Sequence, residues 1–194
     1  MYLFANILAN VVVIFQKVII SGGPGFGKTS IIEELESRQY KCMHEVSRSI
    51  IKEQIESNGD ILPWKNLNTF SRLLFERRVK QFQETANNEW IFFDRGIPDI
   101  IAYMNKDELD VPNSYMLSIE ECNYCPLVFI VPPWREIYKN DAQRMEDYKT
   151  ACELHEIITL TYNNLGYKTI ELPKISVKQR ADYILNKLGI ELNY

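Results

Sequence analysis

Residues 17–21 read Lys-Val-Ile-Ile-Ser, residues 22–29 read Gly-Gly-Pro-Gly-Phe-Gly-Lys-Thr, and residues 30–37 read Ser-Ile-Ile-Glu-Glu-Leu-Glu-Ser. The first segment is a short apolar run, which is typical of a strand buried inside a parallel sheet. The last segment has apolar residues at 31, 32 and 35, as the buried face of an amphipathic helix requires. The middle segment matches G-x-x-x-x-G-K-[ST]. A strand, a glycine-rich loop and a helix in this order predict a phosphate-binding loop.

Triphosphate chemistry explains the residue types in this loop. Its glycines let successive backbone N–H groups turn toward the phosphates, and the amino end of the next helix adds a favourable dipole. Lys28 is the expected catalytic cation on the β- and γ-phosphates, and the Thr29 hydroxyl is an expected Mg²⁺ ligand. The nucleotide is expected to be ATP, with GTP left open. The residues expected to contact it here are Gly22, Gly23, Pro24, Gly25, Phe26, Gly27, Lys28, Thr29 and Ser30.

A second buried strand, expected at residues 90–93, leads into Asp94. An apolar run followed by Asp is the Walker B pattern, so Asp94 is expected beside the loop as a second Mg²⁺ ligand and a catalytic residue. The next residue is Arg95, where motor-type ATPases usually carry a Glu that polarises the attacking water. An Arg there favours an acceptor over hydrolysis. Signalling GTPases are disfavoured too, because residues 105–108, the nearest approach to their Asn-Lys-x-Asp, end in Glu.

Four motifs together resemble one family. They are the phosphate loop, His-Glu-Val-Ser-Arg-Ser-Ile-Ile at 44–51, Phe-Phe-Asp-Arg-Gly-Ile-Pro-Asp at 92–99, and Pro-Pro-Trp-Arg with Asn-Asp-Ala-Gln-Arg within 132–144. The family is the AAA-domain group of small P-loop ATPases, which is similar to nicotinamide riboside kinases and to nucleoside or nucleotide kinases. The resemblance runs from about Lys17 to Leu188. It implies a three-layer α/β/α P-loop NTPase fold with a five-stranded parallel sheet in the order 2-3-1-4-5.

The kinase resemblance assigns substrate binding to Glu45, Arg48 and Arg95. Glu45 follows a strand expected at 40–43, so it lies at the carboxyl edge of the sheet, where α/β proteins bind ligands. Its carboxylate can accept a proton or a hydrogen bond from an acceptor hydroxyl, and either Glu45 or Asp94 is the base. Arg48 lies one helical turn further on, and Arg95 resembles the Arg that touches acceptor or phosphoryl oxygens in nucleoside kinases. The competing interpretations are a helix-start Glu with a solvated Arg48, and a surface ion pair for Arg95.

Residues 134–147 are expected to form a lid. A lid arginine that arrives on closure stabilises the charge on the γ-phosphoryl group and excludes water. Arg144 is the predicted catalytic and nucleotide-binding arginine, because residues 140–141 can cap a helix expected over about 141–164. Arg135 is assigned to the substrate, and a solvated helix Arg is the alternative for Arg144. By analogy with kinases, the loop that contains Pro173 packs against the base.

The remaining expectations concern packing and the surface. Apolar strands are expected at 127–131 and 167–172, and a closing helix at 177–188. An amphipathic helix at 67–84 carries a cationic face that is expected to be solvated rather than part of the acceptor site; its members are Arg72, Arg77, Arg78 and Lys80. Trp64, Tyr115 and Tyr124 look exposed, as partner-binding residues would be.

Composition limits the function classes. The chain has 194 residues, 46% of them hydrophobic and 25% charged, which is typical of one globular domain, here assigned to residues 17–194. The net charge is −4 and no long basic run occurs, so a general DNA or RNA binder is disfavoured. The chain is expected to be cytoplasmic, with no membrane association and an oligomeric state left open.

Residues 1–16 and the four cysteines stand apart from these motifs. Residues 1–16 are apolar and uncharged, and they are shorter than the roughly 20 residues of a membrane span, so we interpret them as an appendage. A membrane-anchored NTPase is the alternative there. Cys122, Cys125, Cys152 and His155 could together hold zinc, but Cys125 runs directly into a strand, so reduced thiols are expected instead.

The leading functional hypothesis is Mg²⁺- and ATP-dependent phosphoryl transfer to a small, nucleoside-like hydroxyl acceptor. Lys28 and Arg144 would stabilise the transferring group, Thr29 and Asp94 would hold the metal, and Glu45 would orient or deprotonate the acceptor. The rival is a nucleotide-binding regulatory module that hydrolyses slowly and acts on a protein partner.

Overall fold

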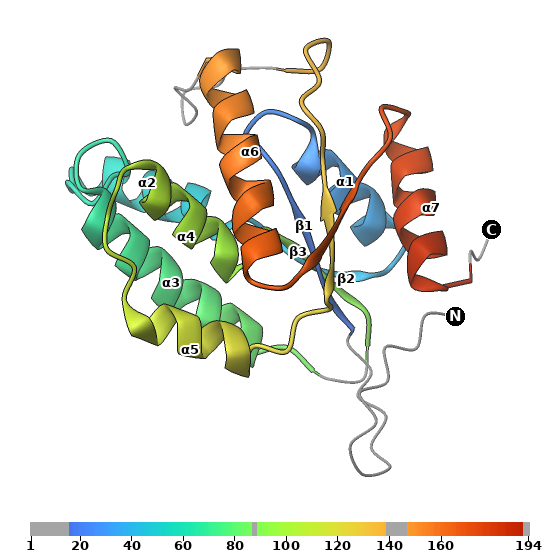
Figure 1. The fold of residues 1–194 in the computed structure, drawn as a ribbon, viewed down its shortest axis with the longest axis horizontal. Coiled ribbons are helices and arrows are strands. Elements are labelled where there is room, and N and C mark those ends of the chain that lie inside the picture. Colours follow the sequence, from blue (N-terminus) through green and yellow to red (C-terminus); the bar gives the residue numbers. More distant parts are fainter. Residues whose placement is uncertain (1–15, 87–88, 139–146, 192–194) are drawn as a thin grey trace.

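A computed structural model describes residues 16–86, 89–138 and 147–191 of the chain. Its strands form one parallel sheet in the order β2-β3-β1-β4-β5, as predicted (Figure 1). The strands are β1 (Lys17–Ser21), β2 (Lys41–Met43), β3 (Ile91–Asp94), β4 (Leu127–Ile130) and β5 (Lys168–Glu171). In the central pair, Ile20 of β1 lies opposite Asp94 of β3. This register brings the carboxyl end of β3 beside the start of the phosphate loop.

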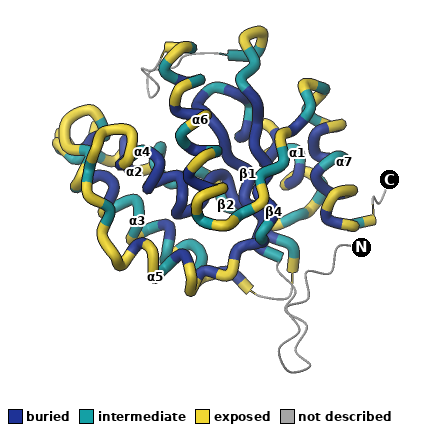
Figure 2. Tube along the Cα trace, in the orientation of Figure 1, coloured by how far each residue is buried: buried dark blue, intermediate teal, exposed yellow. Residues whose placement is uncertain are grey.

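Helices cover both faces of the sheet and make three layers (Figure 1). The helices are α1 (Lys28–Ser37), α2 (Val46–Glu56), α3 (Leu67–Gln83), α4 (Ile97–Lys106), α5 (Asn113–Glu121), α6 (Tyr148–Asn164) and α7 (Val177–Leu188). Side chains alternate along the buried strand β1. Val18 and Ile20 pack with α1 and α7, whereas Ile19 packs with α4 and α6. The three central strands β1, β3 and β4 are buried between these layers, whereas the edge strands β2 and β5 are partly exposed (Figure 2).

Helices α2 and α3 carry a small apolar cluster of their own. Ile50 and Ile51 of α2 pack with Phe70 of α3 and with Leu62 from the connecting loop. Asn66 caps α3, because its side chain accepts a hydrogen bond from the Thr69 N–H at 3.1 Å. The cluster holds the two helices together above the carboxyl ends of β2 and β3, where they form one wall of the site.

Two expectations about these elements are wrong. Helix α6 begins at Tyr148 rather than near 141, because Asp147 caps it by accepting a hydrogen bond from the Thr150 N–H at 2.8 Å. Tyr115 and Tyr124 are buried, whereas Trp64 is 46% exposed. Tyr115 stacks on Phe75 with ring centroids 3.8 Å apart, and the Tyr124 ring packs edge-on against two phenylalanines. Aromatic partners from α3 and β3 therefore cover both tyrosines.

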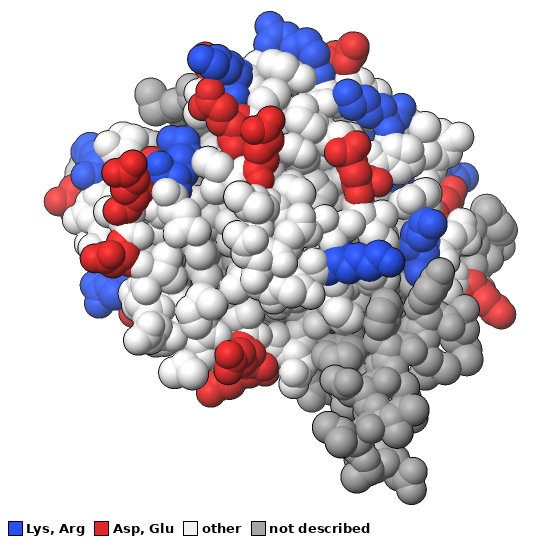
Figure 3. Space-filling view, viewed as in Figure 1, with Lys and Arg blue, Asp and Glu red and all other residues white. Residues whose placement is uncertain are grey.

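The described part of the chain contains no helix that is both long enough and apolar enough to cross a bilayer. The predicted appendage at 1–16 lies outside the described residues except for Gln16, whose carbonyl accepts a hydrogen bond from Ile91 N–H. All four cysteines are free thiols. On the face seen in Figure 3, acidic and basic side chains alternate without forming a single-sign stripe.

Candidate active site

The phosphate loop joins β1 to α1 and has the backbone geometry that its glycines permit. Gly22, Gly25 and Gly27 all have positive φ values, of 126°, 80° and 87°. At Gly22 a Cβ would lie only 2.7 Å from the carbonyl oxygen of Val131, so a side chain does not fit. The Lys28 ammonium is buried and donates to the carbonyls of Gly22 and Gly23 at 3.0 and 2.8 Å. The cation thus lies inside the loop, where phosphate oxygens would meet it.

Thr29 and Asp94, the two predicted metal ligands, are in contact. The Thr29 hydroxyl donates to Asp94 Oδ2 at 3.2 Å. Asp94 is fully buried, and its Oδ1 has no hydrogen-bond partner among the described residues. A buried carboxylate oxygen without a donor, next to a hydroxyl and a phosphate loop, fits a hard divalent cation such as Mg²⁺. Asp94 and Thr29 are therefore the residues that would hold it.

Arg95 follows Asp94 in a left-handed backbone conformation, with a φ of 72°, which is rare for a residue other than glycine. Its side chain is buried and lies between two carboxylates. Nε donates to Glu45 Oε1 at 3.0 Å, and Nη1 donates to Asp99 Oδ1 at 2.8 Å and to the Gly22 carbonyl at 3.2 Å. Arg95 is therefore no surface ion pair. It connects the phosphate loop to the start of α2.

Asp99, in the first turn of α4, is the residue that holds this arrangement together. Besides Arg95, its carboxylate accepts hydrogen bonds from the Ser21 hydroxyl at 2.5 Å, the Gly96 N–H at 2.8 Å and the Tyr162 hydroxyl at 2.5 Å. These donors come from β1, the start of α4, and α6. Because four donors surround it, the carboxylate is a fixed point to which Arg95 is attached.

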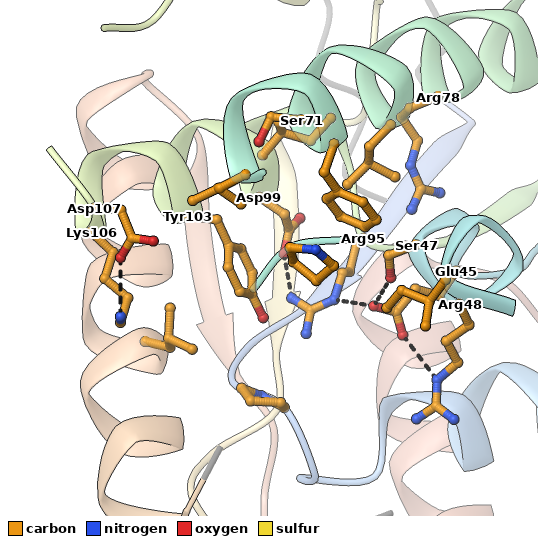
Figure 4. Close-up of a pocket in the computed structure, with 18 of the residues that line it drawn as sticks. Glu45, Ser47, Arg48, Ser71, Arg78, Arg95, Asp99, Tyr103, Lys106 and Asp107 are labelled. Atoms are coloured by element: carbon orange, nitrogen blue, oxygen red, sulfur yellow. Dashed lines mark hydrogen bonds and ion pairs between the residues drawn. The ribbon is translucent and has the colours of Figure 1, made fainter. Parts of the chain in front are cut away.

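Glu45 lies at the N-cap of α2, where its side chain makes no capping hydrogen bond. It instead accepts from Arg95 and from the Ser47 hydroxyl at 2.8 Å, and pairs with Arg48 at 3.5 Å. Figure 4 shows the carboxylate between the two guanidinium groups. The structure brings Glu45, Arg48 and Arg95 together in the lining of one cavity. Glu45 does lie at a helix start, as the alternative has it, but its carboxylate pairs with these arginines instead of capping the helix.

Two cavities meet at Glu45 and Arg48. The smaller, of about 200 Å³, lies over the phosphate loop and is lined by Gly25, Gly27, Lys28, Thr29, Ser30, Glu45, Arg48 and Ile137. The larger, of about 370 Å³, lies between α2, α3 and α4 (Figure 4). Glu45 and Arg48 line both cavities. A molecule in the larger cavity would therefore face the phosphate loop across these two side chains.

The larger cavity has apolar walls and a few polar groups. Its apolar and aromatic lining comes from Ile51, Pro63, Trp64, Leu67, Phe70, Leu74, Ile100 and Tyr103. Its polar lining includes Ser71, Arg95 and Asp99, with Lys106 and Asp107 paired at 3.2 Å beside Tyr103 (Figure 4). Apolar walls with a small number of placed polar groups are the usual lining of a small-molecule site.

The expectation that the cationic face of α3 is solvated is wrong for Arg78. It is only 2% exposed, lines the larger cavity and donates to the Asp94 carbonyl at 3.0 Å and to Gln81 Oε1 at 2.7 Å. Arg72 and Lys80 are exposed as expected, and Arg77 pairs with Glu53. Arg78 therefore satisfies the carbonyl at the end of β3 and places a cation beside Asp94.

Burial and neighbouring charges shift the pKa values of the central groups. Burial and the nearby Arg95 lower the pKa of Lys28 to about 7. Burial alone would raise the pKa of Glu45, but Arg95, Lys28, the Ser47 hydroxyl and Arg48 together lower it to about 2. Burial and the Glu45 charge raise the pKa of Asp94. Glu45 is thus a firmly ionised carboxylate, and Lys28 and Asp94 are groups whose charges a phosphate and a cation would stabilise.

The other predicted site residues are Arg135, Arg144 and Pro173, and those of them that the structure describes line neither cavity. The Arg135 guanidinium lies over the Tyr148 ring, 4.7 Å from its centroid, and Arg135 lines neither cavity. Arg144 lies outside the described residues. Pro173 follows β5 and lines neither cavity. The structure therefore brings the loop, Asp94 and the Glu45 group together, and leaves Arg135 outside the cavities.

Sequence reasoning assigned no role to Asp99 or Tyr162, and it placed Arg78 on a solvated face. A signal existed for Asp99, because Gly-Ile-Pro-Asp at 96–99 is typical of a helix start with an acid in the first turn. Arg78 continues the row of Phe70 and Leu74 at intervals of four residues, which places it on the buried face of α3. Nothing local indicates Tyr162, whose partner Asp99 is 63 residues away.

Comparison with known proteins places the chain in a family. A family model described as AAA domain matches residues 17–180, so the chain belongs to this family. Among solved structures it is similar to NadR protein in complex with NR, at 16% identity and a TM-score of 0.72, covering 93% of this chain and 53% of that one. The chain thus spans about half the length of that NadR chain.

Two smaller kinases match over nearly their whole length. Deoxyadenosine kinase from M. mycoides, with products bound, is 20% identical with a TM-score of 0.64, over 89% of this chain and 98% of that one. Shikimate kinase from Acinetobacter baumannii, in complex with shikimate, is 14% identical with a TM-score of 0.52, over 91% and 94%. At these identities the similarity shows a P-loop kinase-like fold. A search of curated proteins gave no match.

Proposed function

We propose that this protein is a Mg²⁺-dependent kinase that transfers the γ-phosphate of ATP to a hydroxyl of a small, nucleoside-like acceptor. One observation carries the proposal: the cavity over the phosphate loop and the larger apolar cavity share Glu45 and Arg48 as a common wall. An enzyme that only hydrolyses its nucleotide needs no second cavity of about 370 Å³ facing the γ-phosphate position. The geometry therefore supports transfer between two bound molecules.

On the donor side, the loop would bind the triphosphate through its backbone N–H groups and through Lys28. Thr29 and Asp94 would hold Mg²⁺, which when bound neutralises charge on the β- and γ-oxygens. Bound phosphate favours the charged form of Lys28, which otherwise lies in a buried and cationic environment. Arg144, the proposed lid arginine, would add a further positive charge to the transferring group.

On the acceptor side, Glu45 would accept a hydrogen bond from the attacking hydroxyl. With a pKa of about 2 it is a weak base, but its position between Arg95 and Arg48 fixes it in space. Phosphoryl transfer proceeds through a loose transition state, in which orienting the nucleophile matters more than removing its proton early. We therefore assign Glu45 the orientation of the acceptor hydroxyl, and Arg95 and Arg48 the phosphoryl oxygens.

The larger cavity supports an acceptor with one flat apolar part and several polar groups. Phe70, Trp64 and Tyr103 supply aromatic surface, while Ser71 and Asp99 supply polar groups. The structural neighbours include a NadR protein in complex with NR and a deoxyadenosine kinase with deoxynucleotide products bound. A nucleoside-like molecule matches both this lining and this volume.

The test is ADP formation by the purified protein with Mg²⁺-ATP, alone and against a panel of nucleosides, nucleotides and nicotinamide riboside. Lys28→Ala is the blank. We expect one compound to raise turnover about 10²-fold or more, as positioned acceptor groups do, and the blank to abolish the gain. Slow turnover that no compound raises, with nucleotide binding intact, would contradict the kinase and favour the regulatory module.

A further inference from the structure

Arg180 of α7 lies against the phosphate loop, although it is far from Gly27 in the sequence. The position that a Cβ on Gly27 would occupy lies 3.3 Å from Arg180 Nη1 and 3.1 Å from Ile137 Cδ1. On its other side, the Arg180 guanidinium carbon lies 5.4 Å from the ring centroid of Trp134. The guanidinium is thus enclosed between the loop and the segment that follows β4.

This guanidinium is a buried cation without an anionic partner in the described part of the chain. Arg180 is 3% exposed, and its Nε and Nη1 have no hydrogen-bond partner among the described residues. No described carboxylate pairs with it, and burial alone lowers its pKa. A buried charge that is neither paired nor fully hydrogen-bonded destabilises the folded state. Such a group is expected where a ligand supplies the missing partner.

The surroundings of Arg180 are also positive. Gly27 is the N-cap of α1, so the first N–H groups of that helix point into the same space, and they carry the positive end of the helix dipole. The Lys28 ammonium lies in the same loop. Two cations and a helix amino end repel one another unless an anion lies among them.

We propose that Arg180 is a nucleotide-binding residue that contacts the α-phosphate side of the bound nucleoside triphosphate. This inference rests on the proposed function. The γ-phosphate must face the acceptor cavity at Glu45 and Arg48, which lies beside α2, α3 and α4. Helix α7 packs on α1 away from those helices (Figure 1). The chain of phosphates therefore runs from Glu45 past Gly27, and its distal end meets Arg180.

The test combines two measurements on Arg180→Met, which keeps the length of the side chain and removes its charge. Nucleotide affinity is measured by calorimetry with Mg²⁺-ATP and with Mg²⁺-ADP, and the melting temperature is measured without ligand. Lys178→Met is the matched control, because it removes an exposed cation from the first turn of the same helix. Arg180→Lys keeps the charge but loses the planar fork that grips phosphate.

If Arg180 binds the nucleotide, its replacement should change the melting temperature of the free protein and the nucleotide affinity in opposite directions. Arg180→Met should raise the melting temperature of the free protein, because an unpaired buried charge is gone, and weaken ATP and ADP by the same factor of about 10 or more. Arg180→Lys should recover part of the affinity, and Lys178→Met should match the wild type.

Three results would overturn the inference. A lower melting temperature for Arg180→Met with unchanged affinity would make Arg180 a structural residue. A loss of affinity for ATP but not for ADP would place Arg180 at the γ-phosphate. If the wild type binds neither nucleotide, the proposed function fails and this inference fails with it.

Discussion

Asp94 is a fully buried carboxylate and Glu45 a partly buried one, and their surroundings give them different states. Asp94 has one oxygen on the Thr29 hydroxyl and one without a partner, and burial raises its pKa. Glu45 lies between two arginines, which keep it ionised. Under the proposed function, Asp94 would hold the cation and Glu45 would orient the acceptor hydroxyl.

Glu45→Gln tests the acceptor role directly. We expect kcat to fall about 10²- to 10³-fold while KM for ATP changes little, because the phosphate loop remains intact. Since the pKa of Glu45 is about 2, the wild-type rate should show no loss from this group between pH 5 and 8. Steady-state kinetics across that range measure both, and the exposed Glu33→Gln on α1 serves as the control. An unchanged kcat would remove Glu45 from the reaction.

Asp94→Asn tests the metal assignment. In the wild type, Mg²⁺ should tighten ATP binding, and in the variant this gain should largely disappear, because an amide is a poorer ligand for a hard cation than a carboxylate. Titrations of the protein with ATP, once in Mg²⁺ and once in EDTA, give the ratio of the two ATP affinities. The exposed Asp60→Asn should keep the wild-type ratio. An equal Mg²⁺ effect in Asp94→Asn would place the metal elsewhere.

Helix α4 positions the site through its first turn. Gly96 precedes it, and a Cβ there would lie 2.5 Å from Ile19 Cδ1 and 3.1 Å from the Tyr162 hydroxyl. The Gly96 backbone has a φ of −120°, which any residue adopts, so the restriction comes from packing alone. The close approach allows the N–H of Gly96, the hydroxyl of Tyr162 and the guanidinium of Arg95 to reach Asp99 together.

Gly96→Ala should therefore disturb both stability and the site. We expect a loss of about 1–3 kcal/mol in the free energy of unfolding, which is the usual effect of overpacking a core. Urea denaturation measures it. Gly59→Ala is the control: a Cβ there would meet the side-chain ends of Gln54 and Ser57, which can move more readily than core atoms. Equal losses at the two glycines would argue against the tight packing of α4 on β1.

How far the sequence predicts these elements depends on the range of the interactions. The loop and Asp94 follow from local patterns, because a phosphate loop needs its strand, turn and helix to be consecutive. The sheet order was implied by the family resemblance rather than by any local pattern. The Glu45–Arg95 pair required the family resemblance, since the two residues are 50 positions apart. The tie between Asp99 and Tyr162 was not predictable, because it depends on how α4 packs against α6.

For the whole molecule, the two cavities lie at one edge of the sheet. Several of the buried polar residues lie at this edge: Ser21, Lys28, Asp94, Arg95 and Asp99. Buried charges of this kind destabilise the fold unless paired, so stability and function are linked through them.

His155 gives this link a pH dependence. Its ring packs edge-on against Phe26 of the phosphate loop, and burial and the charge of Lys28 lower its pKa to about 4. The unfolded chain, with an ordinary value near 6.5, therefore binds more protons between pH 4 and 6.5. The contribution of neutral His155 to the free energy of unfolding should be fully present above pH 6.5 and be lost as the pH drops toward 4.

His155→Gln should reduce this loss of unfolding free energy between pH 6.5 and 4 by on the order of 2 kcal/mol. Thermal unfolding between pH 4 and 7.5 measures the slope, and the exposed His44→Gln is the control. If His155→Gln keeps the wild-type slope, other groups carry the acid sensitivity.

The most direct test of the shared active site follows the γ-phosphate itself. The protein is mixed with γ-labelled Mg²⁺-ATP and the most active compound of the acceptor panel, and the label is separated into organic and inorganic phosphate. We expect the label in the organic phosphate for the wild type, and little transfer by Lys28→Ala or Glu45→Gln. Label found only in inorganic phosphate, at a rate that Glu45→Gln leaves unchanged, would contradict a kinase built around these two cavities.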